Sequence, residues 1–123
     1  MARKKILLVD DSATVLMMEQ MILSKGPYEI VTAKDGQEGV EKALAVQPDL
    51  ILLDIVMPRM NGFDACKQLR EKEQTKAIPI IMVTTKGELD SVETGYQSGC
   101  SDYVTKPINS LELLSKVRNF LGE

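Results

Sequence analysis

The sequence predicts a doubly wound α/β fold, in which helices cover both faces of a parallel sheet. Short β-branched runs alternate with longer amphipathic runs along the chain, which is typical of βαβ units rather than of a sandwich or a helical bundle. Three of the short runs, ILLV, LILL and IIMV, are apolar throughout. Such runs are expected of strands that helices cover on both faces.

Five strands and five helices are expected to alternate along the chain. Gly26-Pro27 and Gly99 end the first and fourth helices, and Asn109 followed by Glu112 forms a capping box for the last helix. The expected strands span 5–9, 29–33, 50–53, 80–84 and 102–104, and the expected helices span roughly 13–25, 37–46, 62–72, 89–98 and 110–121.

The composition limits the size and class of the protein. A chain of 123 residues with 44% hydrophobic content fits one domain with a core. The 15 basic and 18 acidic residues give a net charge of -3, so nucleic-acid binding is not indicated. The opening MARKKILLV resembles a signal peptide, but its apolar run stops after four residues at Asp10. No apolar stretch approaches the roughly 20 residues of a membrane span, so we expect a cytoplasmic protein without membrane insertion.

The two cysteines do not indicate a metal or redox site. Cys66 and Cys100 are far apart in the sequence, form no CxxC motif, and have no histidine to complete a zinc site. Both are expected to be small, buried, hydrophobic side chains.

Polar residues follow four of the expected strands. Asp10 and Asp11 follow the first strand, Asp54 follows the third, Thr84 closes the fourth, and Lys106 lies just beyond the fifth. In an open parallel sheet, ligands bind outside the carboxyl ends of the strands. The sequence therefore brings three carboxylates, a hydroxyl and an ammonium to one edge of the sheet.

Three carboxylates at one edge repel one another unless a cation joins them. Oxygen ligands are the ones that Mg²⁺ prefers, so Asp10 and Asp11 are expected to hold this ion. Asp54 is the expected nucleophile in a phosphoryl transfer, with Mg²⁺ and Lys106 offsetting the negative charge. The segment MPRMNG that follows it contains Pro58 and Gly62, a turn expected to leave the carboxylate open to solvent.

Each of these residues also has an ordinary structural role open to it. Asp10 and Asp11 could cap the following helix, and Asp54 could cap the following turn. Thr84 could be an ordinary strand residue and Lys106 a solvated charge. Their joint placement at one edge favours the metal site.

The first expected helix is rich in methionine. Met17, Met18 and Met21 are expected to fill gaps in the core. With Leu16, however, they spread apolar character around more of the helix than one buried face needs, which leaves a partner-binding patch as the alternative.

Four segments together resemble the receiver domain of two-component response regulators, specifically the single-domain kind found among chemotaxis regulators. The segments are VDDS (9–12), LLDIVMPRMNG (52–62), PIIMVTT (79–85) and GCSDYVTKP (99–107). They have the order and spacing of that family, and the resemblance covers the whole chain, as one receiver domain (1–123) without an effector domain. It implies a flavodoxin-like, five-stranded sheet with the strand order 2-1-3-4-5.

The resemblance also implies a phosphorylation site. Asp54 would be the phosphoacceptor for a histidine kinase or phosphotransfer protein. Asp11 and Asp54 would bind Mg²⁺ together with the main-chain carbonyl of Val56, and Asp10 would act mostly through water. Lys106 would contact the phosphoryl group, and its peptide bond to the following proline would be cis.

A switch is implied as well. Thr84 and Tyr103 would form the switch pair, although Tyr103 is as readily a packing residue of an edge strand. The surface of the fourth helix, fifth strand and fifth helix would bind a downstream target protein. Such a chain would be a monomer or a weak phosphorylation-dependent dimer, and it would catalyse only its own phosphorylation and dephosphorylation.

Several alternatives stay open. The chain could be a phosphate-independent adaptor, a phosphorelay intermediate or a phosphate sink. A nucleotide or flavin carrier would need a glycine-rich phosphate loop, which this sequence lacks. A Mg²⁺-dependent phosphohydrolase usually has a second acid at the position that Val56 occupies here. Val56 and Lys86 replace the amide and the acid common in relatives, so slow loss of the phosphoryl group is expected.

Overall fold

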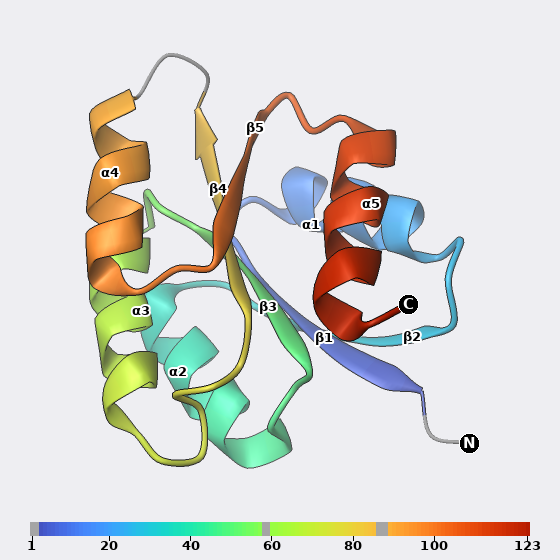
Figure 1. The fold of residues 1–123 in the computed structure, drawn as a ribbon. Coiled ribbons are helices and arrows are strands. Elements are labelled where there is room, and N and C mark those ends of the chain that lie inside the picture. Colours follow the sequence, from blue (N-terminus) through green and yellow to red (C-terminus); the bar gives the residue numbers. More distant parts are fainter. Residues whose placement is uncertain (1–2, 58–59, 86–88) are drawn as a thin grey trace.

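The computed structural model has the predicted α/β architecture (Figure 1) and describes residues 3–57, 60–85 and 89–123. Over these residues, five parallel strands form one sheet in the order β2-β1-β3-β4-β5, as predicted. The strands are β1 (Lys4–Val9), β2 (Tyr28–Ala33), β3 (Leu50–Asp54), β4 (Ile80–Thr85) and β5 (Asp102–Lys106). The helices are α1 (Ala13–Leu23), α2 (Gly36–Val46), α3 (Gly62–Glu71), α4 (Leu89–Ser98) and α5 (Ser110–Leu121).

Helices cover both faces of the sheet. α1 and α5 lie on one face, and α2, α3 and α4 lie on the other (Figure 1). Alternate residues of each strand enter two separate hydrophobic clusters: Leu7 and Ile51 pack on the side of α2 and α3, whereas Ile6 and Leu50 pack on the side of α1 and α5. Every residue of the central strand β3 is buried. This double burial explains why the central strands are apolar throughout.

The helix ends follow from local capping. The Asn109 side chain accepts a hydrogen bond from the Glu112 backbone N–H (2.9 Å), as the capping box predicted. Gly99 follows α4 with φ +106, a conformation that favours glycine. α1 ends at Leu23, two residues before the predicted end, because Ser24 already occupies the C-cap position.

The prediction that the α1 methionines fill the core is wrong. Met17, Met18 and Met21 are 62%, 43% and 65% exposed. The buried residues of α1 are Leu16, Glu19 and Leu23, which follow helical spacing along one side. The methionines lie between these positions, so α1 exposes its methionines and buries its one acidic side chain beside two leucines.

The expectations for the two cysteines and for the peptide bond before Pro107 are confirmed. Cys66 and Cys100 are both free and buried. The peptide bond between Lys106 and Pro107 is cis. Within the described ranges, none of the helices has the length and apolar character needed to cross a membrane.

Candidate functional site

The predicted acidic residues meet at the edge of the sheet where the strands end. β1 ends directly before Asp10 and Asp11, and β3 ends at Asp54. One carboxylate oxygen from each lies within 4.8 Å of the others. These three residues are called the acid cluster below. Their side chains lie close together because parallel strands bring their carboxyl ends to the same edge of the sheet.

The predicted hydroxyl and ammonium come from the two following strands. Asp54 pairs with Val83 on β4, so Thr84 stands one residue further toward the same edge, where its side chain is buried. Thr84 pairs with Thr105, which precedes Lys106 at the end of β5. The structure therefore brings together all the residues that the sequence placed at this edge.

Lys106 forms ion pairs with two members of the acid cluster. Its ammonium lies 3.2 Å from Asp54 Oδ1 and 3.6 Å from Asp10 Oδ2. Burial disfavours the charged form of Lys106, but the carboxylates of Asp54 and Asp10 outweigh this effect and raise its pKa. Lys106 is therefore held in its charged form between the two carboxylates.

The acid cluster is electrostatically unfavourable despite Lys106. Burial and the charge of Asp10 raise the pKa of Asp54 to about 6, and Lys106 opposes them only in part. Burial also raises the pKa of Asp10, with the charge of Asp11 acting in the same direction and the Ser12 backbone and Lys106 opposing it. The two buried carboxylates thus lack the positive charge that would fully compensate them.

One carboxylate oxygen of Asp10 also lacks a hydrogen-bond partner. Asp10 Oδ1 accepts a hydrogen bond from the Ser12 backbone N–H (2.9 Å). Asp10 Oδ2 is buried and has no hydrogen-bond partner among the residues that the structure describes, since Lys106 at 3.6 Å is an ion-pair contact only. Buried polar atoms are rarely left in this state. The all-oxygen donor set with an unpartnered buried oxygen fits a hard divalent cation such as Mg²⁺.

A glycine allows α3 to begin close to Asp54. The Gly62 N–H donates a hydrogen bond to the Ile55 carbonyl (2.8 Å), and Asn61 caps the helix by accepting from the Asp64 N–H. A Cβ atom on Gly62 would lie 2.2 Å from the backbone oxygen of Asp54. Any side chain at this position would push the loop away from the phosphoacceptor candidate.

The expectation that this loop leaves Asp54 open to solvent is wrong for most of the side chain, which is only 8% exposed. The reason is that Asp54, the last residue of β3, is still paired with Val83 on β4 and so stays within the sheet. Val56, two residues later, is 71% exposed. Pro58 and Lys86, which also entered the sequence analysis, lie outside the described residues.

Tyr103 makes packing contacts on the edge of the sheet, and these contacts leave its proposed switch role untested. It lies on the edge strand β5, pairs with Met82, and packs partly buried against the cluster that contains Leu53 and Met82. Its ring also contacts the ring of Tyr96 from α4 at a centroid distance of 6.2 Å and an angle of 88°.

Glu19 is a charged residue of this region that the sequence analysis did not identify. It is 1% exposed, and its Oε1 has no hydrogen-bond partner within the described part of the chain. Burial raises its pKa to about 8, the charge of Asp10 acts in the same direction, and Lys106 opposes it. The sequence feature that could have identified Glu19 is that it is the one ionisable side chain in its helix, ATVLMMEQMIL.

Comparison with known proteins finds relatives of similar length and others that are about twice as long. Protein PilH of Pseudomonas aeruginosa is 40% identical over 118 residues, which is 96% of this chain and 98% of PilH. The crystal structure of the chemotaxis protein CheY4 of Vibrio cholerae matches with a TM-score of 0.90 and 36% identity, covering 98% of this chain and all of that one. The chain spans about half the length, 48%, of several curated transcriptional regulators that it also matches.

A third relative bears on the metal. The receiver domain of the sensor histidine kinase PA1611 from Pseudomonas aeruginosa PAO1 matches with a TM-score of 0.91 and 29% identity, over 99% of this chain and all of that one. That crystal structure contains a magnesium ion in the active-site cleft. Receiver domains bind Mg²⁺ in an acidic site and serve in two-component signalling rather than as classical enzymes. The family model of the response regulator receiver domain matches residues 6–118, so this chain belongs to the response regulator receiver family.

Proposed function

We propose that this chain is a cytoplasmic receiver in which Asp54 accepts a phosphoryl group from a histidine kinase or a phosphotransfer protein. The observation that supports this most strongly is the position of Lys106, 3.2 Å from Asp54 and 3.6 Å from Asp10. A carboxylate that attacks phosphorus approaches a group that is itself negatively charged, so positive charge must stand beside it. Lys106 supplies one such charge.

The acid cluster supplies the ligands for a second positive charge, that of a metal ion. Asp10, Asp11 and Asp54 would hold Mg²⁺, with the main-chain carbonyl of Val56 as a further oxygen ligand. The unpartnered Asp10 Oδ2 and the raised pKa values of Asp10 and Asp54 support this assignment, because both indicate missing positive charge. When bound, Mg²⁺ would neutralise charge on the phosphoryl oxygens.

The transfer itself requires only one new bond to the protein. A carboxylate oxygen of Asp54 forms a bond to phosphorus while the bond from phosphorus to the donor's imidazole nitrogen breaks, and the electron pair stays on that nitrogen. Lys106 then binds the transferred group, and the Thr84 hydroxyl donates to it. These two groups favour one of two conformational states of the domain.

The surface formed by α4, β5 and α5 would carry the signal to a downstream target protein, with Tyr103 as the aromatic member of the switch. Phosphorylation changes the free-energy difference between the two states only by the difference in its interaction energy with each of them. The unphosphorylated protein must therefore already sample both states, so some activity without phosphate is expected. We propose that the protein is a monomer that dimerises, at most weakly, when it is phosphorylated.

The test is incubation with acetyl phosphate and Mg²⁺, followed by intact-mass measurement. The wild-type chain and Asp64→Asn, which removes an exposed carboxylate of α3, should each gain the mass of one phosphoryl group. Asp54→Asn should gain none, and Lys106→Met should gain it more slowly. A phosphoryl group that appears on Asp54→Asn would contradict the proposal.

Other results would favour the alternative functions. Turnover of a small phosphate ester without a stable mass gain would indicate a phosphohydrolase. No reaction with acetyl phosphate or with a phosphorylated histidine donor would indicate a phosphate-independent adaptor. Passage of the group from Asp54 to a phosphotransfer protein would indicate a phosphorelay intermediate or a phosphate sink.

A further inference from the structure

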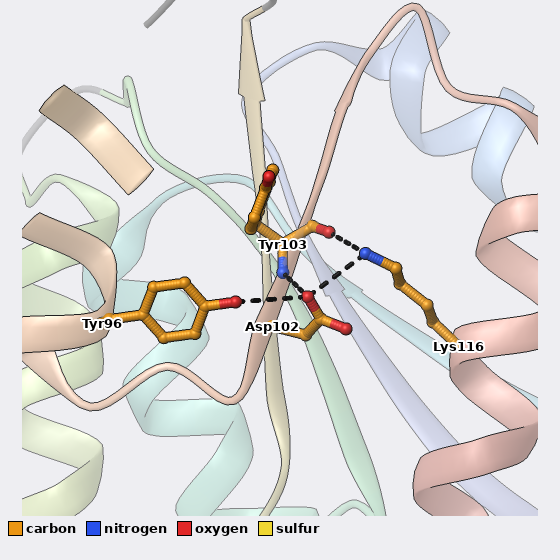
Figure 2. Close-up of polar contacts among 4 residues, drawn as sticks. All are labelled: Tyr96, Asp102, Tyr103 and Lys116. Atoms are coloured by element: carbon orange, nitrogen blue, oxygen red, sulfur yellow. Dashed lines mark hydrogen bonds and ion pairs between the residues drawn. The ribbon is translucent and has the colours of Figure 1, made fainter. Parts of the chain in front are cut away.

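A polar network ties the start of β5 to the two helices beside it. Figure 2 shows Tyr96 reaching from α4 and Lys116 reaching from α5 toward Asp102 on β5. Asp102 Oδ1 accepts hydrogen bonds from the Tyr103 backbone N–H (2.7 Å), from Lys116 Nζ (3.2 Å) and, at longer range, from the Tyr96 hydroxyl (3.4 Å). A single carboxylate oxygen thus connects three elements of the molecule.

Lys116 contacts Tyr103 in two further ways. Its ammonium donates a hydrogen bond to the Tyr103 carbonyl (2.6 Å) and lies 5.1 Å from the centre of the Tyr103 ring. A cation this close to an aromatic ring is attracted to it electrostatically. Lys116 therefore fixes both the backbone and the ring of Tyr103.

The ring of Tyr103 is held from the other side by Tyr96, whose edge-to-face contact is favourable for aromatic pairs. The ion pair between Lys116 and Asp102 is only partly exposed, with each side chain 26% accessible. Solvent therefore screens it less than it screens a more exposed pair such as Lys76 and Glu73. Of these contacts, the one between the Lys116 ammonium and the Tyr103 ring and the one between the two tyrosine rings depend on the position of the Tyr103 ring.

We propose that Lys116 is a positioning residue that holds the Tyr103 ring in its observed place through Asp102 and through direct contact with the ring. This inference rests on the proposed function in one respect, because it assigns Lys116 control over how readily the surface formed by α4, β5 and α5 changes. A ring that moves away loses both the contact with the Lys116 ammonium and the contact with the Tyr96 ring. Loss of the cation alone should favour departure of the ring about two- to fivefold.

The experiment uses the full chain with 3-fluorotyrosine at its three tyrosines, which gives one fluorine NMR signal each for Tyr28, Tyr96 and Tyr103. Tyrosine-to-phenylalanine variants assign the signals. Beryllium fluoride with Mg²⁺, which mimics a carboxylate-bound phosphoryl group, gives a reference position for the altered state. The measurement that tests the inference is made on the unmodified protein, without either reagent.

Lys116→Met keeps the aliphatic stem and removes the charge, so the Tyr103 signal should shift or broaden while the Tyr28 signal stays in place. Lys116→Arg should restore the wild-type position, because an arginine can serve both Asp102 and the ring. Asp102→Asn should give a smaller shift of the same sign. Lys76→Met, which removes a lysine from an exposed ion pair, is the matched control and should change nothing.

An unchanged Tyr103 signal in folded Lys116→Met would overturn the inference, as would a failure of Lys116→Arg to restore the signal. Far-ultraviolet circular dichroism checks that each variant is folded, and Asp102→Asn tests the same network should Lys116→Met not fold. Phosphorylation by acetyl phosphate, measured on the same samples, reports on the proposed function alone. A chain that is never phosphorylated can therefore still support or contradict the role of Lys116.

Discussion

Lys106 lies with its ammonium 3.2 Å from Asp54 Oδ1, so the phosphoacceptor candidate of the unmodified protein is already paired with the cation proposed to bind the phosphoryl group. One lysine does not balance the acid cluster, because Asp10 Oδ2 is buried without a hydrogen bond from the described residues and the pKa of Asp54 stays raised. The site is thus prepared to gain positive charge, and its stability should depend on whether that charge is present.

Asp54→Asn should stabilise the protein at pH 7 in the absence of Mg²⁺. The substitution removes a charge that burial and Asp10 disfavour, and the raised pKa corresponds to roughly 1–3 kcal/mol in the free energy of unfolding. Urea denaturation in EDTA measures the difference. Glu41→Gln, an exposed acid on α2, is the control and should change stability little, whereas a less stable Asp54→Asn would contradict the account.

The stabilisation by Asp54→Asn should also depend on pH with a definite sign. Folding raises the pKa of Asp54 from 3.8 to about 6, so the folded chain holds this proton more tightly than the unfolded chain. The contribution of Asp54 is therefore fully present below pH 3.8 and is lost as the pH rises through about 6. The advantage of Asp54→Asn over wild type should grow across this window in EDTA and then level off. Saturating Mg²⁺ should reduce it.

Glu19→Leu should stabilise the protein at pH 7. Glu19 is buried, its Oε1 has no hydrogen-bond partner among the described residues, and its pKa is raised to about 8, so folding carries the cost of neutralising it. An apolar residue of similar size removes that cost, by roughly 2–4 kcal/mol. Glu19→Gln should give a smaller gain. Thermal unfolding of the three proteins is the measurement, and a marked loss of stability in Glu19→Leu would show that the carboxyl group is needed.

Gly62→Ala should destabilise the protein by roughly 1–3 kcal/mol and slow the phosphorylation of Asp54. The added Cβ would lie 2.2 Å from the Asp54 backbone oxygen, and backbone cannot move aside as a side chain can. Gly95→Ala is the control, because its nearest contact is the Cys100 side chain at 3.3 Å. Equal stability and equal acetyl phosphate reaction rates in the two variants would contradict the proposed role of Gly62.

Val56→Asn should shorten the lifetime of phosphorylated Asp54. Val56 is 71% exposed and its side chain offers a water molecule no hydrogen bond, whereas a side-chain amide there could orient a water toward the phosphoryl group. Val56→Leu should leave the decay unchanged. The decay after removal of acetyl phosphate can be followed by intact mass. Equal decay rates of wild type and Val56→Asn would show that the Val56 side chain does not set the lifetime of phosphorylated Asp54.

Much of the fold and of the site could be predicted because strand pattern and strand-end chemistry are local. The apolar run that ends at Asp54 defines a buried parallel strand, and parallel strands necessarily bring Asp54, Asp10 and Lys106 to one edge. The family resemblance added the strand order, which pattern alone does not determine.

Other features depend on tertiary packing that periodicity does not encode. An apolar residue signals burial only if its side of the helix faces the sheet, and in α1 that side holds Glu19 while Met17 and Met21 face outward. The network around Asp102 likewise requires Lys116, fourteen residues later, to return beside β5. These contacts appear only once the chain is folded.

The most direct test of the central claim is to map the modified residue. Treatment with acetyl phosphate and Mg²⁺, followed by borohydride reduction and peptide mass spectrometry, converts an aspartyl phosphate to homoserine at the residue that carried it. The account predicts homoserine at position 54 only, and none when Mg²⁺ is removed with EDTA. Homoserine at position 10 or 11, or equal conversion without Mg²⁺, would contradict it.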